Sequence, residues 1–432
     1  MYSRDDVKAI TDKILNMSGA DATVINFNGQ ERSGTRWANS TITTNLVQYN
    51  QNLSITVRVG QKQGGASTRD FSDASLQSTV DEAMAAAKDS PDRENLPELL
   101  GPQDYVEVDA ALPSGVGFGP AERAMMVKES LDLSEEMGTV GAGYIPKVYN
   151  TECEANSEGL FAFYSVAEAG FILTCRTPDG AGSGWAGITG IKDVSMINAR
   201  ELTRVASEKA LKSVNPRAIE PGRYTVILEP RANARFLSLM TGILNQGSNN
   251  EFIRNKQPGD RIFSEGMTLK SDIGNPVLRQ TPILNDNTPA APVTWIEKGV
   301  LRNRAGADGV RATPNMSPVM DGTDLSIDEM VRQTRRGLLV TFFWYIRGVD
   351  NATLLNTGMT RDGLFLIENG EIAGPVQNFR WNMSPLVGYN NLTLVGRPVP
   401  MHMGESYDGG TTGLIPPVRI EDFYMTSISP AV

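Results

Sequence analysis

Two segments of turn-forming residues interrupt this sequence, and they limit how large any one folded unit can be. Residues 89–104 are rich in Pro, Asp and Glu, and residues 215–222 combine Asn, Pro and Gly in the manner of tight turns. A chain of 432 residues is also too long for one ordinary hydrophobic core. The sequence therefore predicts three domains, with expected boundaries at 1–90, 105–215 and 220–432.

The first 215 residues combine helical and strand patterns. Strands of alternating apolar and polar residues are expected around the pairs Asn28-Gly29 and Gly64-Gly65, which favour tight turns. Apolar residues at helical spacing predict helices at 1–18, 72–88 (capped by Ser72), 120–137 and 198–213. This half should consist of helices packed on curved antiparallel sheet units.

The last 210 residues are dominated by strand patterns. Tyr224–Leu228 reads as a strand, and an apolar stripe then predicts a helix over 231–245. A capping box at Ser326 marks another helix, Leu338–Ile346 reads as a buried strand, and Asn369-Gly370 predicts a hairpin. The whole chain is therefore expected to be an α+β protein whose C-terminal domain is strand-rich with few helices.

Charge and hydropathy exclude several classes of protein. The formal net charge is −10, whereas proteins that bind nucleic acids through phosphate contacts are basic. The longest apolar run, Gly337 to Ile346, is about half of the roughly 20 residues that a membrane-spanning helix needs. No apolar signal segment follows Met1. We therefore expect a cytoplasmic protein that binds neither membranes nor nucleic acids.

The sequence holds one histidine and two cysteines. His402 lacks a second histidine with which to form a metal site, and we expect it at a surface or interface even though Glu405 and Asp408 follow it closely. Cys153 and Cys175 are expected to be free and buried. The composition therefore argues against most metal-dependent and histidine-dependent catalysis by this chain alone.

One C-terminal stretch is highly characteristic. Thr357–Ile372 reads T-G-M-T-R-D-G-L-F-L-I-E-N-G-E-I, and the pattern continues through Gly374–Asn382 to Ser384–Leu386. It resembles the TldD/PmbA family, also called the TldD–TldE peptidases or "modulator of DNA gyrase" proteins. The upstream segment Arg336–Asp350 and the order of the two halves fit the same family, so the resemblance covers nearly the whole chain.

The resemblance also implies where a zinc site would lie. TldD-type members carry an H-E-x-x-x-H motif on the helix after the first C-terminal strand, together with a later cysteine. Here that motif falls on Ser238–Ile243, with Ser238, Leu239 and Ile243 at the ligand and base positions and Gly242 kept. No cysteine follows Cys175. Leu and Ile cannot bind zinc, so we expect no metal or other cofactor and a motif region that has become core.

This pattern is that of the TldE (PmbA) type of subunit. The resemblance then implies a non-catalytic partner of a zinc-bearing TldD-type chain, in a closed dimer around a chamber that admits unfolded or flexible peptides. Arg361, Asp362, Asn378 and His402 are candidate peptide-contacting residues of that chamber. Its strands would bind extended peptide by β-addition.

Two other functions stay open at this point. The chain is compatible with a homodimeric peptide-binding or regulatory protein that has no role in proteolysis. It is also compatible with an enzyme that performs a different chemistry in the same chamber. The binding of metal, and association with a zinc-bearing relative, separate these alternatives.

Overall fold

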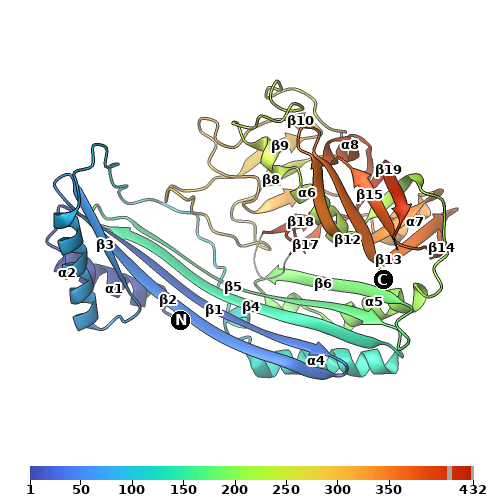
Figure 1. The fold of residues 1–432 in the computed structure, drawn as a ribbon, viewed down its shortest axis with the longest axis horizontal. Coiled ribbons are helices and arrows are strands. Elements are labelled where there is room, and N and C mark those ends of the chain that lie inside the picture. The colour runs from blue at the N-terminus through green and yellow to red at the C-terminus, as the bar shows by residue number, and fades with distance from the viewer. Residues whose placement is uncertain (406–410, 430–432) are drawn as a thin grey trace.

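The computed structural model describes residues 1–405 and 411–429 and shows an α+β fold. A long curved sheet forms the N-terminal half, and a strand-rich unit with few helices stacks on one end of it (Figure 1). This confirms the fold class expected from the sequence. No helix within the described ranges has the length and apolarity to cross a membrane.

The secondary-structure elements are divided between the two halves of the chain. Those of the N-terminal half are α1 (Arg4–Met17), β1 (Ala22–Ala38), β2 (Thr41–Val59), β3 (Lys62–Thr68), α2 (Asp73–Asp89), α3 (Pro113–Val116), α4 (Pro120–Glu136), β4 (Val140–Asn156), β5 (Phe161–Arg176), β6 (Ser183–Ile191), η1 (Val194–Met196) and α5 (Ala199–Lys212). Those of the C-terminal half are β7 (Gly222–Leu228), α6 (Pro230–Ser238), η2 (Thr241–Leu244), β8 (Leu269–Ser271), β9 (Val293–Glu297), β10 (Val300–Leu301), β11 (Pro318–Met320), α7 (Ile327–Arg332), β12 (Arg336–Asp350), β13 (Leu355–Glu368), β14 (Glu371–Pro375), β15 (Phe379–Met383), α8 (Pro385–Asn390), β16 (Leu392–Val395), β17 (Val399–His402), β18 (Thr412–Ile415) and β19 (Val418–Ile428).

One antiparallel sheet runs through the N-terminal half in the order β3-β2-β1-β4-β5-β6. Helices α1 and α2 cover one end of it, and α4 and α5 cover the other end on the face turned away from the C-terminal unit (Figure 1). Each helix pair closes its own apolar cluster. The sheet continues across the predicted boundary between residues 90 and 105, and the division into three domains stays a prediction.

The expected turn at Asn28-Gly29 is wrong. Both residues lie inside β1, where they pair with Asn52 and Gln51 of β2 on one side and with Glu152 and Thr151 of β4 on the other. A strand paired on both sides has its backbone hydrogen bonds satisfied by its neighbours, so the local turn preference of Asn-Gly is overridden. The chain turns instead at Asn39 and Ser40, which have positive φ.

The expected turn at Gly64-Gly65 is also wrong, because both glycines lie inside β3. The turn comes earlier, at Gly60, which has φ +59°. A Cβ added at Gly64 would lie 2.1 Å from the backbone nitrogen of Ala87 in α2. Gly64 is therefore glycine because helix α2 packs directly against the strand backbone.

Most of the predicted helices and the C-terminal hairpin are confirmed. Ser3 and Ser72 cap α1 and α2, and Ser326 forms the expected capping box at the start of α7. Asn369-Gly370 turns β13 into β14. The helix expected over 231–245 is shorter than predicted, because α6 ends at Ser238 and a 3₁₀ turn follows it.

Two mixed sheets build the C-terminal half. Their strand orders are β10-β9-β8-β11-β18-β17 and β12-β7-β19-β15-β13-β14. Phe236 of α6 lies at the centre of the largest apolar cluster, with ring centroids 5.5 Å from Tyr389, 5.6 Å from Phe423 and 6.3 Å from Trp381. This aromatic packing holds α6 against the sheet that contains β12 and β13.

The first half of β2 forms an open edge of the long sheet. Strand β3 pairs only with Leu53–Val59, so residues 41–52 pair with β1 alone within the described structure. Ile42, Leu46, Val47 and Tyr49 are exposed there, and Tyr49 is 63% exposed. No residue in 41–52 carries a charge.

The glycine contact at α2 gives a test of the fold. Gly64→Ala places a methyl group against the backbone of α2, so we expect a loss of about 1–3 kcal/mol in unfolding free energy, measured by chemical denaturation. Gly19→Ala is the matched control, because a Cβ there meets nothing within 4 Å. Equal stability of the two variants would contradict the proposed packing.

Candidate functional site

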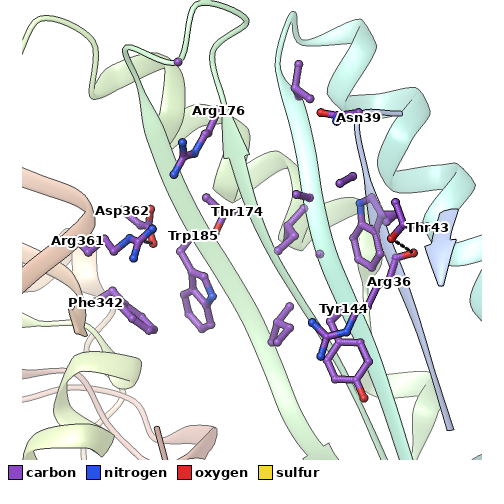
Figure 2. A pocket seen from close by; sticks show the side chains of 18 of the residues that line it. Arg36, Asn39, Thr43, Tyr144, Thr174, Arg176, Trp185, Phe342, Arg361 and Asp362 are labelled. Atoms are coloured by element: carbon purple, nitrogen blue, oxygen red, sulfur yellow. Dashed lines mark hydrogen bonds and ion pairs between the residues drawn. The ribbon is translucent and has the colours of Figure 1, made fainter. Parts of the chain in front are cut away.

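A cleft of about 930 Å³ lies between the long sheet and the C-terminal unit. Its floor is the sheet face formed by the ends of β1, β4, β5 and β6, and its wall is formed by β12 and β13 (Figure 2). The volume is near the upper end of the roughly 300–1,000 Å³ of small-molecule sites. An extended peptide segment of several residues fits a cleft of this size.

Strand register assembles the floor. Arg36 of β1 pairs with Tyr144 of β4, and Tyr144 pairs with Ile172 of β5. Two residues further along β5, Thr174 pairs with Trp185 of β6. Because side chains two residues apart on a strand share a face, these residues all point into the cleft.

The wall is mainly aromatic. Phe342 and Trp344 lie two residues apart on β12, and their ring centroids are 6.1 Å apart. Phe342 also meets Trp185 of the floor at 5.5 Å, and the guanidinium of Arg361 lies 5.5 Å from the ring centroid of Trp344. The cleft thus offers flat apolar surfaces with a cation beside them.

Asp362 joins the wall to the floor. Its carboxylate accepts a hydrogen bond of 2.5 Å from the hydroxyl of Ser183 on β6 and lies 3.6 Å from Nε of Arg361. Only 7% of the residue is exposed, and its φ of 54° is in the left-handed region that Asp tolerates better than most residues. Asp362 therefore fixes the position of β13 over the edge of the long sheet.

Arginines dominate the charged groups around the cleft. The guanidinium of Arg36 lies 4.2 Å from the ring centroid of Tyr144, and Arg176 is exposed at the other end of the floor (Figure 2). Glu405 at the rim lies 3.6 Å from Arg235 and 3.8 Å from Arg347. Nearby arginines thus offset the charge of both carboxylates of the cleft, Asp362 and Glu405. Arg36 and Arg176 add further positive charge to its lining.

The four peptide-contacting candidates from the sequence do not form one group. Arg361 and Asp362 line the cleft, as Figure 2 shows. Asn378 lines a neighbouring cavity of about 300 Å³, which shares Asp362 with the cleft and is also lined by Ser183. Asp362 therefore lies between the two cavities.

His402 is buried rather than at a surface, which corrects the expectation for it. It is 4% exposed and ends β17, where its backbone pairs with Thr412. Arg231 of α6 donates hydrogen bonds to the carbonyls of His402 and Gly404. His402 is not among the residues that line the cleft. Asp408, which follows it closely in the sequence, lies outside the described residues.

The zinc-motif positions lie where α6 gives way to the 3₁₀ turn. Ile243 is 4% exposed and belongs to the large apolar cluster, as expected for core. Leu239 is only half-buried, and together with Gly242 and Ile243 it lines an open cavity of about 470 Å³. The expectation that the whole motif region is core is therefore too broad, because Leu239 borders solvent.

The side chains at these positions do not fit a zinc ion. Ser238 donates its hydroxyl to the carbonyl of Arg235, and the positions of the second histidine and the glutamate hold apolar groups. Within residues 1–405 and 411–429, no three His, Cys, Asp or Glu side chains gather closely enough to hold a metal. The chemistry of the motif helix is that of packing rather than ligation.

Both cysteines are free and buried, as expected. Burial raises the pKa of the Cys153 thiol to about 12, and burial likewise raises the pKa of Cys175. A thiol needs a lowered pKa to act as a nucleophile near neutral pH. The two cysteines are therefore inert structural residues.

The floor of the cleft was missed from the sequence. Arg36, Tyr144, Arg176 and Trp185 come from four strands and form no motif, and only the pairing of the strands brings them together. The wall residues Phe342 and Trp344 lie in the segment that was interpreted as a buried strand, so their apolar character was visible but their exposure to a cleft was not.

Comparison with known families assigns the chain. Residues 221–427 match the model of the PmbA/TldA metallopeptidase C-terminal domain, and residues 25–87 match that of the PmbA/TldA metallopeptidase domain 1. Together the two matches cover more than half of the sequence. The chain belongs to the TldD/PmbA family. No curated protein matches this TldD/PmbA family member by sequence.

Solved structures share the fold of this TldD/PmbA chain. A putative modulator of a DNA gyrase from Thermotoga maritima has a TM-score of 0.78 and 17% identity, covering 97% of this chain and 99% of that one. TldE from Thermococcus kodakarensis also has a TM-score of 0.78 and 17% identity, with coverages of 98% and 100%. A putative modulator of DNA gyrase from Bacteroides thetaiotaomicron has a TM-score of 0.73 and 17% identity, with coverages of 99% and 100%.

The different burial of Leu239 and Ile243 leads to a stability prediction for this TldD/PmbA chain. Ile243→Glu buries a carboxylate in the apolar cluster, so a loss of at least about 2–5 kcal/mol is expected. Leu239→Glu leaves its carboxylate in the open cavity, and a loss of about 0.5–2 kcal/mol is expected. Chemical denaturation of both variants measures the difference, and equal losses would show that the two sites have the same environment.

Proposed function

We propose that this chain is a non-catalytic, TldE/PmbA-like subunit of a TldD–TldE-type metallopeptidase assembly that acts on unfolded or flexible peptides. The observation that carries the proposal is the chemistry at Ser238, Leu239 and Ile243. In a chain of this family, the residues at the zinc-motif positions supply a hydroxyl and two apolar groups instead of two imidazoles and a carboxylate.

The large cleft supports a role in holding peptide. Its floor is a sheet face and its wall presents aromatic rings, which suit an extended chain with apolar side chains. Cleavage would then require the zinc and its activated water on a TldD-type partner, since this chain supplies neither the ligands nor a histidine base in the cleft. In this division of roles, the present chain positions substrate and the partner hydrolyses it.

The same cleft favours one alternative. It is built from a single chain, so peptide binding here does not depend on a zinc-bearing partner. A homodimer that binds peptides without cleaving them is therefore the second candidate function. The proposal places either form in the cytoplasm, since two unpaired cysteines suit a reducing compartment.

Metal content and activity test the proposed division of roles. The purified chain should contain zinc far below one equivalent and cleave no unfolded protein, because the motif positions lack ligands. Elemental analysis and a casein-cleavage assay measure the two properties. Addition of a TldD-type chain that carries H-E-x-x-x-H should produce chelator-sensitive cleavage. Stoichiometric zinc with cleavage by the chain alone would contradict the proposal.

Assembly gives a second test. The chain should sediment as a dimer with itself at micromolar concentration, and a TldD-type partner should replace one copy. Sedimentation velocity of each chain alone and of the mixture measures this. A monomer under all these conditions would contradict the proposed chamber between two chains.

A further inference from the structure

We infer that the cleft between the long sheet and the C-terminal unit selects extended peptides with acidic side chains. The inference rests on the proposed peptide-holding function and specifies which peptides the site takes. It comes from the charge of the cleft, from the way its arginines are held, and from the arrangement of its aromatic rings.

The charge of the cleft is opposite to that of the whole chain. The chain carries a formal net charge of −10. Three arginines line the cleft, Arg36, Arg176 and Arg361, against the carboxylates of Asp362 and Glu405. Arg235 and Arg347 lie against Glu405 and offset its charge. A local excess of positive charge inside an acidic protein attracts an anionic ligand to this cleft in preference to the rest of the surface.

Two of these arginines are not used by the protein's own carboxylates. Within the described residues, neither Arg36 nor Arg176 has an ion-pair partner. The guanidinium of Arg36 lies over the ring of Tyr144, at 4.2 Å from the ring centroid, which restricts its motion while leaving its edge donors open. A guanidinium held in this way loses less entropy when it binds a carboxylate.

Arg361 contributes a third donor group at the wall. Its Nε lies 3.6 Å from Asp362, which is within ion-pair distance but too long for a hydrogen bond. That nitrogen is buried and has no hydrogen-bond partner. Asp362 already accepts a hydrogen bond from Ser183. The side chain of Arg361 is nevertheless 32% exposed, so a ligand carboxylate can approach its guanidinium through the exposed part rather than through Nε.

The aromatic rings define the rest of the ligand. Trp185 and Phe342 face each other across the floor and the wall, at 5.5 Å between ring centroids. In Figure 2, Trp185 and Phe342 lie on the side of Arg361, and Arg36 lies across the floor beside Tyr144. An extended peptide that alternates acidic and apolar side chains can present carboxylates to Arg36 on one side of the cleft and apolar groups to the rings on the other side.

A single-stranded nucleic acid also combines negative charge with planar rings, but the charges of this chain favour an acidic peptide as the ligand of the cleft. A chain of net charge −10 repels a continuous phosphate backbone outside the cleft. The cleft itself holds two carboxylates, which an extended phosphate chain would have to pass. A peptide with separated carboxylates avoids both sources of repulsion.

Fluorescence anisotropy tests the inference with defined probes. The first probe is a fluorescein-labelled, C-terminally amidated peptide of alternating Glu and Phe. Its counterparts replace Glu by Gln or by Lys, and a labelled oligothymidine serves as the nucleic acid. At about 50 mM salt the Glu peptide should bind at least about tenfold more tightly than the Gln peptide, and this ratio should fall at about 500 mM salt because screening weakens charge attraction.

Matched variants locate the effect. Arg36→Gln and Arg176→Gln should each weaken binding of the Glu peptide by about threefold to tenfold and leave the Gln peptide nearly unchanged. Arg69→Gln is the control, because this replacement changes the net charge by the same amount. Arg69 is exposed directly after β3 and does not line the cleft. Both cleft arginines are exposed, so their replacement should leave the melting curve unchanged.

The outcomes separate this inference from the proposed function. Equal binding of the Glu and Gln peptides would overturn the acidic selectivity and leave peptide binding standing. Tighter binding of the Lys peptide or of oligothymidine than of the Glu peptide would also overturn the acidic selectivity. So would an Arg69→Gln variant that weakens binding of the Glu peptide as much as Arg36→Gln and Arg176→Gln do. A Gln peptide with a free C-terminal carboxylate could also bind as tightly as the Glu peptide. That result would overturn selectivity for acidic side chains, because the arginines would then bind the C-terminal carboxylate of a peptide. Failure of all the peptides to bind would overturn both proposals.

Discussion

The pairing of β1 with both of its neighbours is the constraint on which the rest of the structure depends. β1 pairs with β2 and β4 along nearly its whole length, so any slip in its register would shift the residues that face the cleft and those that face the helices. That register puts Arg36 beside Tyr144 and gives Trp37 to the cluster under α4 and α5. The cleft floor is therefore a consequence of sheet formation.

The C-terminal unit is held on this sheet by the apolar packing of Ile172 and Trp185 and by polar contacts. Ser183 donates to Asp362, and Lys209 of α5 lies 2.6 Å from Glu229 at the start of α6. Both carboxylates belong to residues that are less than one-tenth exposed. Charged groups in such positions are costly unless they are paired. The contacts therefore fix one orientation of the two halves, and the width of the cleft follows from it.

Helices were the most predictable part of the fold, and turns were the least. Ser72 and Ser326 act through local hydrogen bonds, so their signals survive in the folded protein. Asn28-Gly29 and Gly64-Gly65 carry equally strong local signals, but strand pairing and contact with α2 overrode them. Asn369-Gly370 kept its turn because it joins two strands that pair directly with each other.

The candidate site was predictable only where it lies within one segment. Arg361 and Asp362 were found because they belong to a characteristic stretch of sequence, and they do line the cleft. Arg36, Arg176 and Trp185 were not found, because residues on different strands become neighbours only through long-range pairing. The burial of Leu239 was overestimated because apolar spacing does not show where a helix ends.

The open edge of β2 has a consequence for the behaviour of the protein in solution. In the part of the chain that the structure describes, its residues 41–52 present unpaired backbone donors and acceptors along one side. This segment contains no Lys, Glu or Pro, the residues by which exposed edges normally discourage further pairing. Repulsion between net negative charges opposes contact between two molecules over most of their surface, but residues 41–52 carry no charge. The twelve uncharged residues of this edge therefore favour association between copies of the isolated chain despite its overall acidity.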